Sequence, residues 1–137
     1  MLRCPKTTDL PATSATVLVV DDTASARYLV TKTLDDLGFT TLIAADGAAA
    51  LSSVRDYHPD AIVTDLEMPG MDGERLIEKL RSSAHGWIRG LPIIVCSSKT
   101  DAKTVGKLRQ LGVDAVVPKP VDRRLLAEEA LRLFNKT

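Results

Sequence analysis

The chain has 137 residues, of which 45% are hydrophobic and 26% are charged, and its 18 basic residues balance its 18 acidic ones. A chain of this length predicts one domain with one core. The zero net charge gives no support to a nucleic-acid-binding or membrane-binding surface, so we expect a cytoplasmic protein with neither kind of partner.

Residues 1–15, MLRCPKTTDLPATSA, are rich in Pro, Thr and Ser and show no hydrophobic periodicity. This composition predicts a flexible N-terminal tail, followed by a domain over residues 16–137. The first residues lack the apolar region of a secretory signal peptide, and no apolar run in the sequence is long enough to span a membrane. Cys4 lies in the tail and Cys96 in an apolar run, so we expect neither a disulfide nor a cysteine metal site.

Five short runs from Thr16 onward are apolar at nearly every position. Such runs are typical of strands covered on both faces, as in a parallel sheet. The predicted strands are TVLVV (16–20), TTLIA (40–44), DAIVTD (60–65), LPIIVCS (91–97) and VDAVV (113–117).

Amphipathic patterns between and after these runs predict five helices. Strict alternation of strand and helix with right-handed crossovers gives an α/β fold, a doubly wound five-stranded parallel sheet. The apolar positions that mark the helices are Ala26, Leu29, Val30, Leu34 and Leu37; Leu51 and Val54; Leu76, Ile77 and Leu80; Val105, Leu108 and Leu111; and Leu126, Ala130, Leu133 and Phe134.

Polar side chains stand where the predicted strands end. Asp21 and Asp22 follow the first strand, and Lys119 lies just past the fifth. Asp65 is the last residue of the third strand, and Ser97 is the last residue of the fourth. Ligands of open α/β sheets bind beyond the carboxyl ends of the strands, so we expect these groups to converge at one edge.

Clustered carboxylates repel one another unless a cation is present, and hard oxygen ligands suit Mg²⁺. With Mg²⁺ bound, the ammonium and the hydroxyl can donate to phosphoryl oxygens while one carboxylate acts as the nucleophile. Such a site needs mainly positioning and charge neutralisation from the protein. The residues therefore predict phosphoryl transfer onto an aspartate.

Four motifs, VLVVDD, DLEMPGMDG, PIIVCSS and VVPKP, stand in this order at the predicted strand ends. In them the chain, from Val17 to about Phe134, resembles the receiver domains of two-component response regulators, including the single-domain chemotaxis regulator. The resemblance implies a flavodoxin-like sheet with strand order 2-1-3-4-5. It also implies a protein that promotes only its own phosphorylation and dephosphorylation, and is not otherwise an enzyme.

The resemblance also assigns roles to individual residues. It implies a cis peptide bond before Pro120, the kind of site to which cis bonds are essentially confined. Asp65 would be the phosphoacceptor, Asp22 a direct Mg²⁺ ligand, Asp21 a ligand mainly through water, Glu67 a ligand through its backbone carbonyl, and Ser97 and Lys119 the groups that bind phosphoryl oxygens.

The partners that the resemblance implies are a histidine kinase or a phosphotransfer protein, with a downstream protein target that the sequence does not identify. It also allows a dimer that forms on phosphorylation. A stand-alone regulator, a phosphorelay intermediate and a receiver from a hybrid kinase all remain open. A receiver-like binding module that works without phosphorylation is a further alternative, although every expected site position carries usable chemistry.

Other classes fit the sequence less well. A flavin carrier needs a phosphate-binding loop after the first strand, where this chain has two carboxylates. A dinucleotide dehydrogenase needs a G-x-G-x-x-G fingerprint, which the chain lacks. An aspartate-dependent phosphatase would use Glu67 as a general acid, but the lysine-proline motif favours a receiver.

Glu67, Ser98 and Val116 depart from the commonest receiver pattern, and Ser98 stands where a smaller Ala is frequent. Glu67 stands where Asn is frequent, and its carboxylate can either repel a phosphoryl group or position water. Val116 stands where many receivers carry an aromatic switch residue. We therefore expect the effect of phosphorylation to reach the surface by a route other than the movement of an aromatic side chain. Gly106 inside DAKTVGKLRQL predicts a helix that is easily displaced, with close packing as the alternative reason for the glycine.

Overall fold

The computed structural model describes residues 15–134, which form a parallel sheet of five strands in the order β2-β1-β3-β4-β5 with helices on both faces. The α/β class and the strand order are therefore confirmed. The elements are β1 (Thr16–Val20), α1 (Ala24–Asp36), β2 (Thr40–Ala44), α2 (Gly47–Tyr57), β3 (Ala61–Asp65), α3 (Gly73–Arg81), α4 (Gly86–Arg89), β4 (Ile93–Ser97), α5 (Ala102–Gln110), β5 (Ala115–Pro118) and α6 (Arg123–Phe134).

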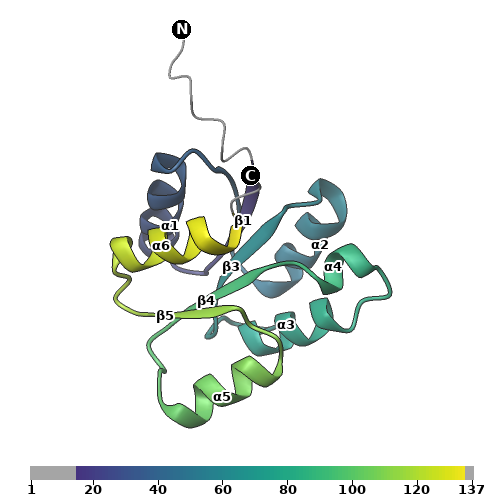
Figure 1. The fold of residues 1–137 in the computed structure, drawn as a ribbon. Helices are drawn as coiled ribbons and strands as arrows, with labels where there is room; N and C mark the ends of the chain where they lie inside the picture. The colour runs from purple at the N-terminus through teal and green to yellow at the C-terminus, as the bar shows by residue number, and fades with distance from the viewer. Residues whose placement is uncertain (1–14, 135–137) are drawn as a thin grey trace, which may run out of the picture.

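The sheet separates two hydrophobic cores, because successive side chains of a strand point to opposite faces. Leu18 and Ile62 pack on the side of α2, α3 and α5, whereas Val19 and Ile94 pack on the side of α1 and α6. Figure 1 shows α1 and α6 together on one side of the sheet and the other long helices on the opposite side. Both faces of the central strands β1, β3 and β4 are covered, which explains their nearly continuous apolar sequences, whereas the edge strand β2 is partly exposed.

Strand register decides which chain segments meet at the carboxyl edge of the sheet. Val20 pairs with Thr64, Asp65 pairs with Cys96, and Ser97 pairs with Pro118. The last residues of β1, β3 and β4 therefore lie in successive positions across the sheet. The loops that follow these strands lie side by side.

Aspartate side chains accept hydrogen bonds from first-turn amides of four helices, among them α6, where Asp122 accepts from the amides of Arg124 and Leu125. Asp46 accepts a hydrogen bond from the amide of Ala49, and Asp72 accepts one from the amide of Arg75. Asp101 caps α5 in the same way. Each cap satisfies a backbone N–H that the first turn leaves unpaired, and such a cap stabilises a helix by roughly 1 kcal/mol.

The structure has two hydrophobic cores where the length led us to expect one, and β4 and β5 begin two residues later than expected, at Ile93 and Ala115. It also differs from the sequence-based expectation at two further places. α4 is a sixth helix, where we expected a loop; with one turn and one buried side chain, Ile88, it is too short to produce a periodic pattern. Ala15, expected in the tail, is fully buried, and its carbonyl accepts from the amide of Thr40. The rest of the predicted tail, Cys4 included, lies outside the described residues. No helix of residues 15–134 is both long and apolar enough to cross a membrane.

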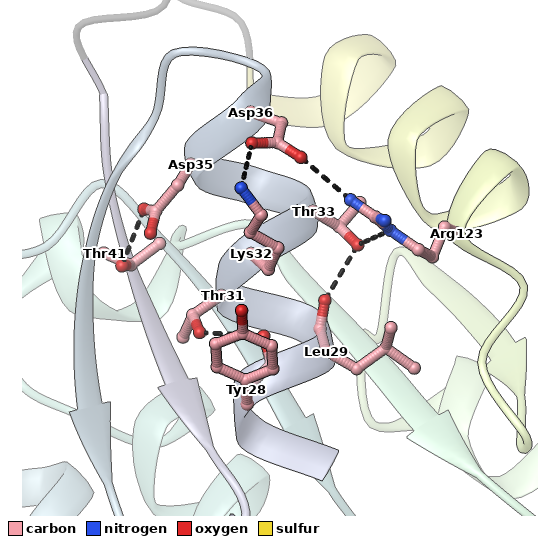
Figure 2. Close-up of polar contacts among 9 residues, drawn as sticks. All are labelled: Tyr28, Leu29, Thr31, Lys32, Thr33, Asp35, Asp36, Thr41 and Arg123. Carbon is pink, nitrogen blue, oxygen red and sulfur yellow. Dashed lines mark hydrogen bonds and ion pairs between the residues drawn. The ribbon is translucent and has the colours of Figure 1, made fainter. Parts of the chain in front are cut away.

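Polar contacts join α1 to α6 across the sequence (Figure 2). The guanidinium of Arg123 donates from Nε to the buried Thr33 hydroxyl at 2.8 Å and from a terminal nitrogen to Asp36 at 2.9 Å. Thr33 in turn donates to the carbonyl of Leu29 at 2.8 Å. Lys32 completes the group with an ion pair to Asp36 at 3.0 Å. Arg123 thus adds polar contacts to the apolar packing between the first and last helices.

Candidate functional site

Three carboxylates gather at the carboxyl edge of the sheet. Asp21 and Asp22 follow β1, and Asp65 is the last residue of β3. One oxygen of each side chain lies within 4.8 Å of an oxygen of the others. The neighbouring positions of β1 and β3 in the sheet bring these residues together, as the sequence predicted.

Asp21 is only 3% exposed, and hydrogen bonds hold both its side chain and its backbone. Its Oδ1 accepts a hydrogen bond from the amide of Thr23 at 2.9 Å, and its carbonyl accepts one from Arg27 at 2.6 Å. Asp22 is exposed, and within residues 15–134 no side chain pairs with it. One carboxylate of the cluster is therefore fixed and another is open to solvent.

Lys119 connects β5 to this cluster. Its Nζ lies 3.0 Å from Asp21 Oδ2 and 3.2 Å from Asp65 Oδ2. Burial disfavours the charged ammonium, but hydrogen bonding to Asp21 and the charges of both carboxylates outweigh it and raise the pKa of Lys119. The side chain is therefore a cation throughout the physiological pH range. The peptide bond from Lys119 to Pro120 is cis.

The loop after Asp65 is closed by a glycine that sequence reasoning did not single out. The amide of Leu66 donates to Asp65 Oδ1 at 2.7 Å, and the amide of Gly73 donates to the carbonyl of Leu66 at 2.8 Å. A Cβ at Gly73 would meet the Asp65 carbonyl oxygen at 2.2 Å. Only glycine permits this approach, and its position after the capping Asp72 was the sequence signal that could have shown it.

Ser97 and Glu67 lie at different depths in the site. Ser97 is 2% exposed, and its hydroxyl accepts from the amide of Lys99 at 2.9 Å. Glu67 is exposed, and its carboxylate forms an ion pair with Lys99 Nζ at 3.2 Å. Lys99, which carried no signal in the sequence, thus contacts the hydroxyl through its backbone and the carboxylate through its side chain. This pair links the loop after β3 to the loop after β4.

Val116 lies away from the carboxylates. It pairs with Val95 in the sheet, is half buried, and lines a cavity of about 420 Å³ with Val105 and Pro118. Behind the site, Cys96 is a buried free thiol, and burial raises its pKa to about 12 although Lys119 opposes the shift. Neither side chain contributes a charge to the site.

The donor set fits a hard divalent cation. Three carboxylates supply oxygen ligands, which are the kind that Mg²⁺ prefers. Lys119 pairs with Asp21 and Asp65 and leaves Asp22 unpaired, so the cluster still carries excess negative charge. Within residues 15–134 this is the one group of three or more acidic, histidine or cysteine side chains close enough to hold a metal ion together.

Comparison with known proteins identifies the class. The family model of the response regulator receiver domain matches residues 17–131. The chain is 36% identical over 118 residues to the DNA-binding response regulator MtrA of Mycobacterium tuberculosis, covering 85% of this chain and 50% of MtrA. It is 32% identical over 121 residues to the chemotaxis protein CheY of Pseudomonas aeruginosa, covering 88% of this chain and 96% of CheY.

A solved structure gives the same result. The receiver domain of the sensor histidine kinase PA1611 from Pseudomonas aeruginosa superposes with a TM-score of 0.78 and 26% identity, covering 88% of this chain and 98% of that one. In that structure a magnesium ion is coordinated in the active-site cleft. The chain therefore belongs to the response regulator receiver domain family, and it carries an acidic triad of the kind found at a phosphoacceptor site. It spans about half the length of MtrA and nearly all of CheY.

Proposed function

We propose that this chain accepts a phosphoryl group on Asp65 from a phosphorylated histidine of a kinase or phosphotransfer protein, and that the modification changes the surface it offers to a partner. The observation that carries the proposal is the position of Asp65 at the end of β3, within 4.8 Å of two further carboxylates and 3.2 Å from the Lys119 ammonium. A histidine kinase partner is general to the family.

In the proposed transfer, a carboxylate oxygen of Asp65 attacks phosphorus. The phosphorus–nitrogen bond of the donor breaks, and the imidazole leaves with the bonding electron pair and takes up a proton. Asp65 becomes an acyl phosphate. Lys119 already contacts Asp65, so its ammonium can move to a phosphoryl oxygen with little rearrangement, and Ser97 can donate from its hydroxyl.

Mg²⁺ is the proposed cofactor, held by Asp22 and Asp65 directly, by Asp21 mainly through water, and by the carbonyl of Glu67. Bound there, it would neutralise charge on the phosphoryl oxygens. Two observations support this assignment: the oxygen-rich donor set of this chain and the magnesium ion found in the PA1611 receiver domain. The pairing of Lys119 with Asp21 keeps that carboxylate in place while Asp22 stays free.

The first prediction tests the phosphoacceptor. Incubation with acetyl phosphate and Mg²⁺ should add the mass of one phosphoryl group to the intact chain, because Asp65 is the carboxylate that contacts Lys119 from the end of a central strand. Asp65→Asn should show no addition, and EDTA should abolish it in the unsubstituted chain.

Asp60→Asn is the matched control, because Asp60 lies at the opposite end of β3, where it accepts from the amide of Thr16. That variant should label like the parent. Labelling that survives Asp65→Asn, or that ignores EDTA, would contradict the proposal.

A further inference from the structure

A groove lies between α2, α3 and α4, far from the acidic cluster. It consists of two adjoining cavities of about 190 Å³ and 300 Å³, which share Arg55, His85 and Ile88. His58, which lines one of them, ends α2 just before β3 begins. The groove therefore lies toward the amino ends of the strands, whereas the carboxylates lie at their carboxyl ends. Figure 1 shows these three helices together at one side of the molecule.

The groove has an apolar floor and a basic rim. The floor is apolar side chains of the hydrophobic core, among them Val54, Leu80 and Ile88. Arg55 and Lys79 stand exposed at the rim, and neither forms an ion pair within residues 15–134. No lining residue is acidic. The full lining is Leu51, Val54, Arg55, His58, Lys79, Leu80, Ser83, His85, Trp87 and Ile88.

Trp87 forms one wall, and it is 42% exposed. Its ring lies 4.4 Å from the imidazole of His58. His58 is the one non-glycine residue of the described chain with a positive φ, 49°, a conformation that costs an L-residue roughly 1–2 kcal/mol and that glycine adopts freely. The positive φ of His58 favours a functional role for its imidazole, because residues with strained backbones cluster at binding sites.

We propose that this groove docks an acidic segment of a partner protein that carries a large aliphatic side chain. The argument is charge complementarity: two unpaired cations and two histidines surround an apolar floor that has no carboxylate of its own. Tryptophan and arginine are the side chains most enriched where protein partners bind tightly. An extended nucleic acid would need a longer basic surface, and this chain has no net charge. The site goes beyond the proposed phosphoacceptor function and is independent of it.

The chain has a built-in reporter for the test, because Trp87 is its only tryptophan. The probe is an acetylated, amidated peptide of about a dozen residues, rich in Asp and Glu, with Leu at helical spacing and without Trp. Titration into the full chain should change Trp87 emission saturably. Raising NaCl from about 50 to about 500 mM should weaken binding severalfold, because the Debye length shortens to a few ångströms.

Two charge variants separate the groove from the rest of the surface. Arg55→Glu combined with Lys79→Glu should weaken binding by roughly tenfold or more, since like charges then face the peptide. Arg124→Glu, an exposed position on α6 at the other side of the sheet, should bind like the parent. Circular dichroism checks that each variant is folded. Asp65→Asn should also leave binding unchanged, which keeps this test separate from that of phosphorylation.

Several outcomes would overturn the inference. These are no saturable change up to millimolar peptide, equal binding of a peptide with Lys in place of the acidic residues, and loss of binding in Arg124→Glu as large as in the groove variant. Tighter binding of a single-stranded oligonucleotide or of inorganic phosphate than of the peptide would also overturn it, because the groove would then be a general anion site.

Discussion

At the scale of single residues, two lysines form the ion pairs with the carboxylates of the candidate site and its neighbouring loop. Lys119 contacts Asp21 and Asp65, and Lys99 contacts Glu67 at the rim. The first lysine is partly buried and its pKa is raised, so it is a fixed part of the site. The second is exposed, so its ion pair can open and close at little cost. These two lysines therefore differ in what their removal should change.

The Glu67–Lys99 pair should affect the lifetime of the acyl phosphate more than the stability of the fold. We expect Glu67→Asn to change the dephosphorylation rate severalfold, because a charge this near the site alters the hydrolysis of a phosphoryl group. Lys99→Ala should change it too, and the two effects should not add, because the side chains contact each other. The measurement is phosphoprotein decay after removal of the donor.

The control measurement is the free energy of unfolding of the same variants, obtained by urea denaturation. An exposed ion pair contributes about 0–1 kcal/mol, so the free energy of unfolding should hardly change. An unchanged decay rate in both variants would show that Glu67 points away from the phosphoryl group, and additive effects would show that Glu67 and Lys99 act independently.

Cys96 gives a pH-dependent prediction. Its folded pKa of about 12 lies above the ordinary thiol value of roughly 8.5. Its contribution to stability is thus complete below about pH 8.5 and is lost as the pH rises toward 12, because the unfolded chain releases the proton first. In Cys4→Ser at pH 8.5, iodoacetamide should label Cys96 slowly in the folded protein and rapidly in denaturant. Rapid labelling of the folded protein would contradict this.

At the scale of elements, α5 has the fewest buried side chains of the long helices. Leu108 is its only buried side chain, and Lys107 ties it to α3 through an ion pair with Glu74 at 2.8 Å. A Cβ at Gly106 would meet no atom within 4 Å. Close packing is therefore wrong as the reason for this glycine. The structure leaves the hypothesis that α5 is easily displaced.

Gly106→Ala should stabilise the protein by up to about 1 kcal/mol, because alanine favours helix and has room here. Urea unfolding measures this. Beryllofluoride with Mg²⁺ should alter amide exchange over residues 98–111, and the substitution should reduce that response. A destabilised variant, or residues 98–111 unaffected by beryllofluoride, would defeat the hypothesis that activation moves this helix.

Arg81, the last residue of α3, donates to the last residue of α4 and to the loops that precede β4 and β5. Its guanidinium donates to the carbonyls of Arg89, Leu91 and Gly112 at 2.6, 2.7 and 2.6 Å. It also lies 3.5 Å from Asp114 Oδ2, which caps the amide of Ile93. The end of α3 thereby holds the turns that enter β4 and β5.

Arg81→Ala should lower the free energy of unfolding by roughly 2–4 kcal/mol, because three backbone carbonyls, one of them partly buried, lose a charged donor. Arg81→Lys should restore less than half, since an ammonium cannot reproduce the planar fork. Urea unfolding measures both. Arg75→Ala is the control: its ion pair with Glu78, at 3.7 Å, is exposed and should contribute little. Equal effects at the two arginines would contradict this role.

At the scale of the whole molecule, the two proposed sites occupy opposite ends of the sheet. The phosphoacceptor stands at the carboxyl ends of the strands, and the basic groove stands where α2 and α4 lead back toward the amino ends. The strands between them are packed on both faces. In this proposal the chain is phosphorylated at the carboxyl ends of the strands and binds a partner near their amino ends.

The sequence alone determined the strands, the long helices and the edge at which polar groups gather, because apolar periodicity and strand-end chemistry are local signals. β3, for example, was expected at residues 60–65 and is found at Ala61–Asp65. The cis bond before Pro120, which the family resemblance implied, is confirmed. The sequence did not predict α4, because one helical turn is too short to show a hydrophobic periodicity.

Only the tertiary structure decided which side chains meet. The contact of Lys119 with Asp21 joins residues 98 apart in the chain, and that of Arg81 with Gly112 joins residues 31 apart. The close approach of Gly73 to Asp65 and the basic groove around Trp87 likewise exist only when separate elements pack together. Distances of this kind depend on how separate strands and helices pack against one another, which no pattern within a single element encodes.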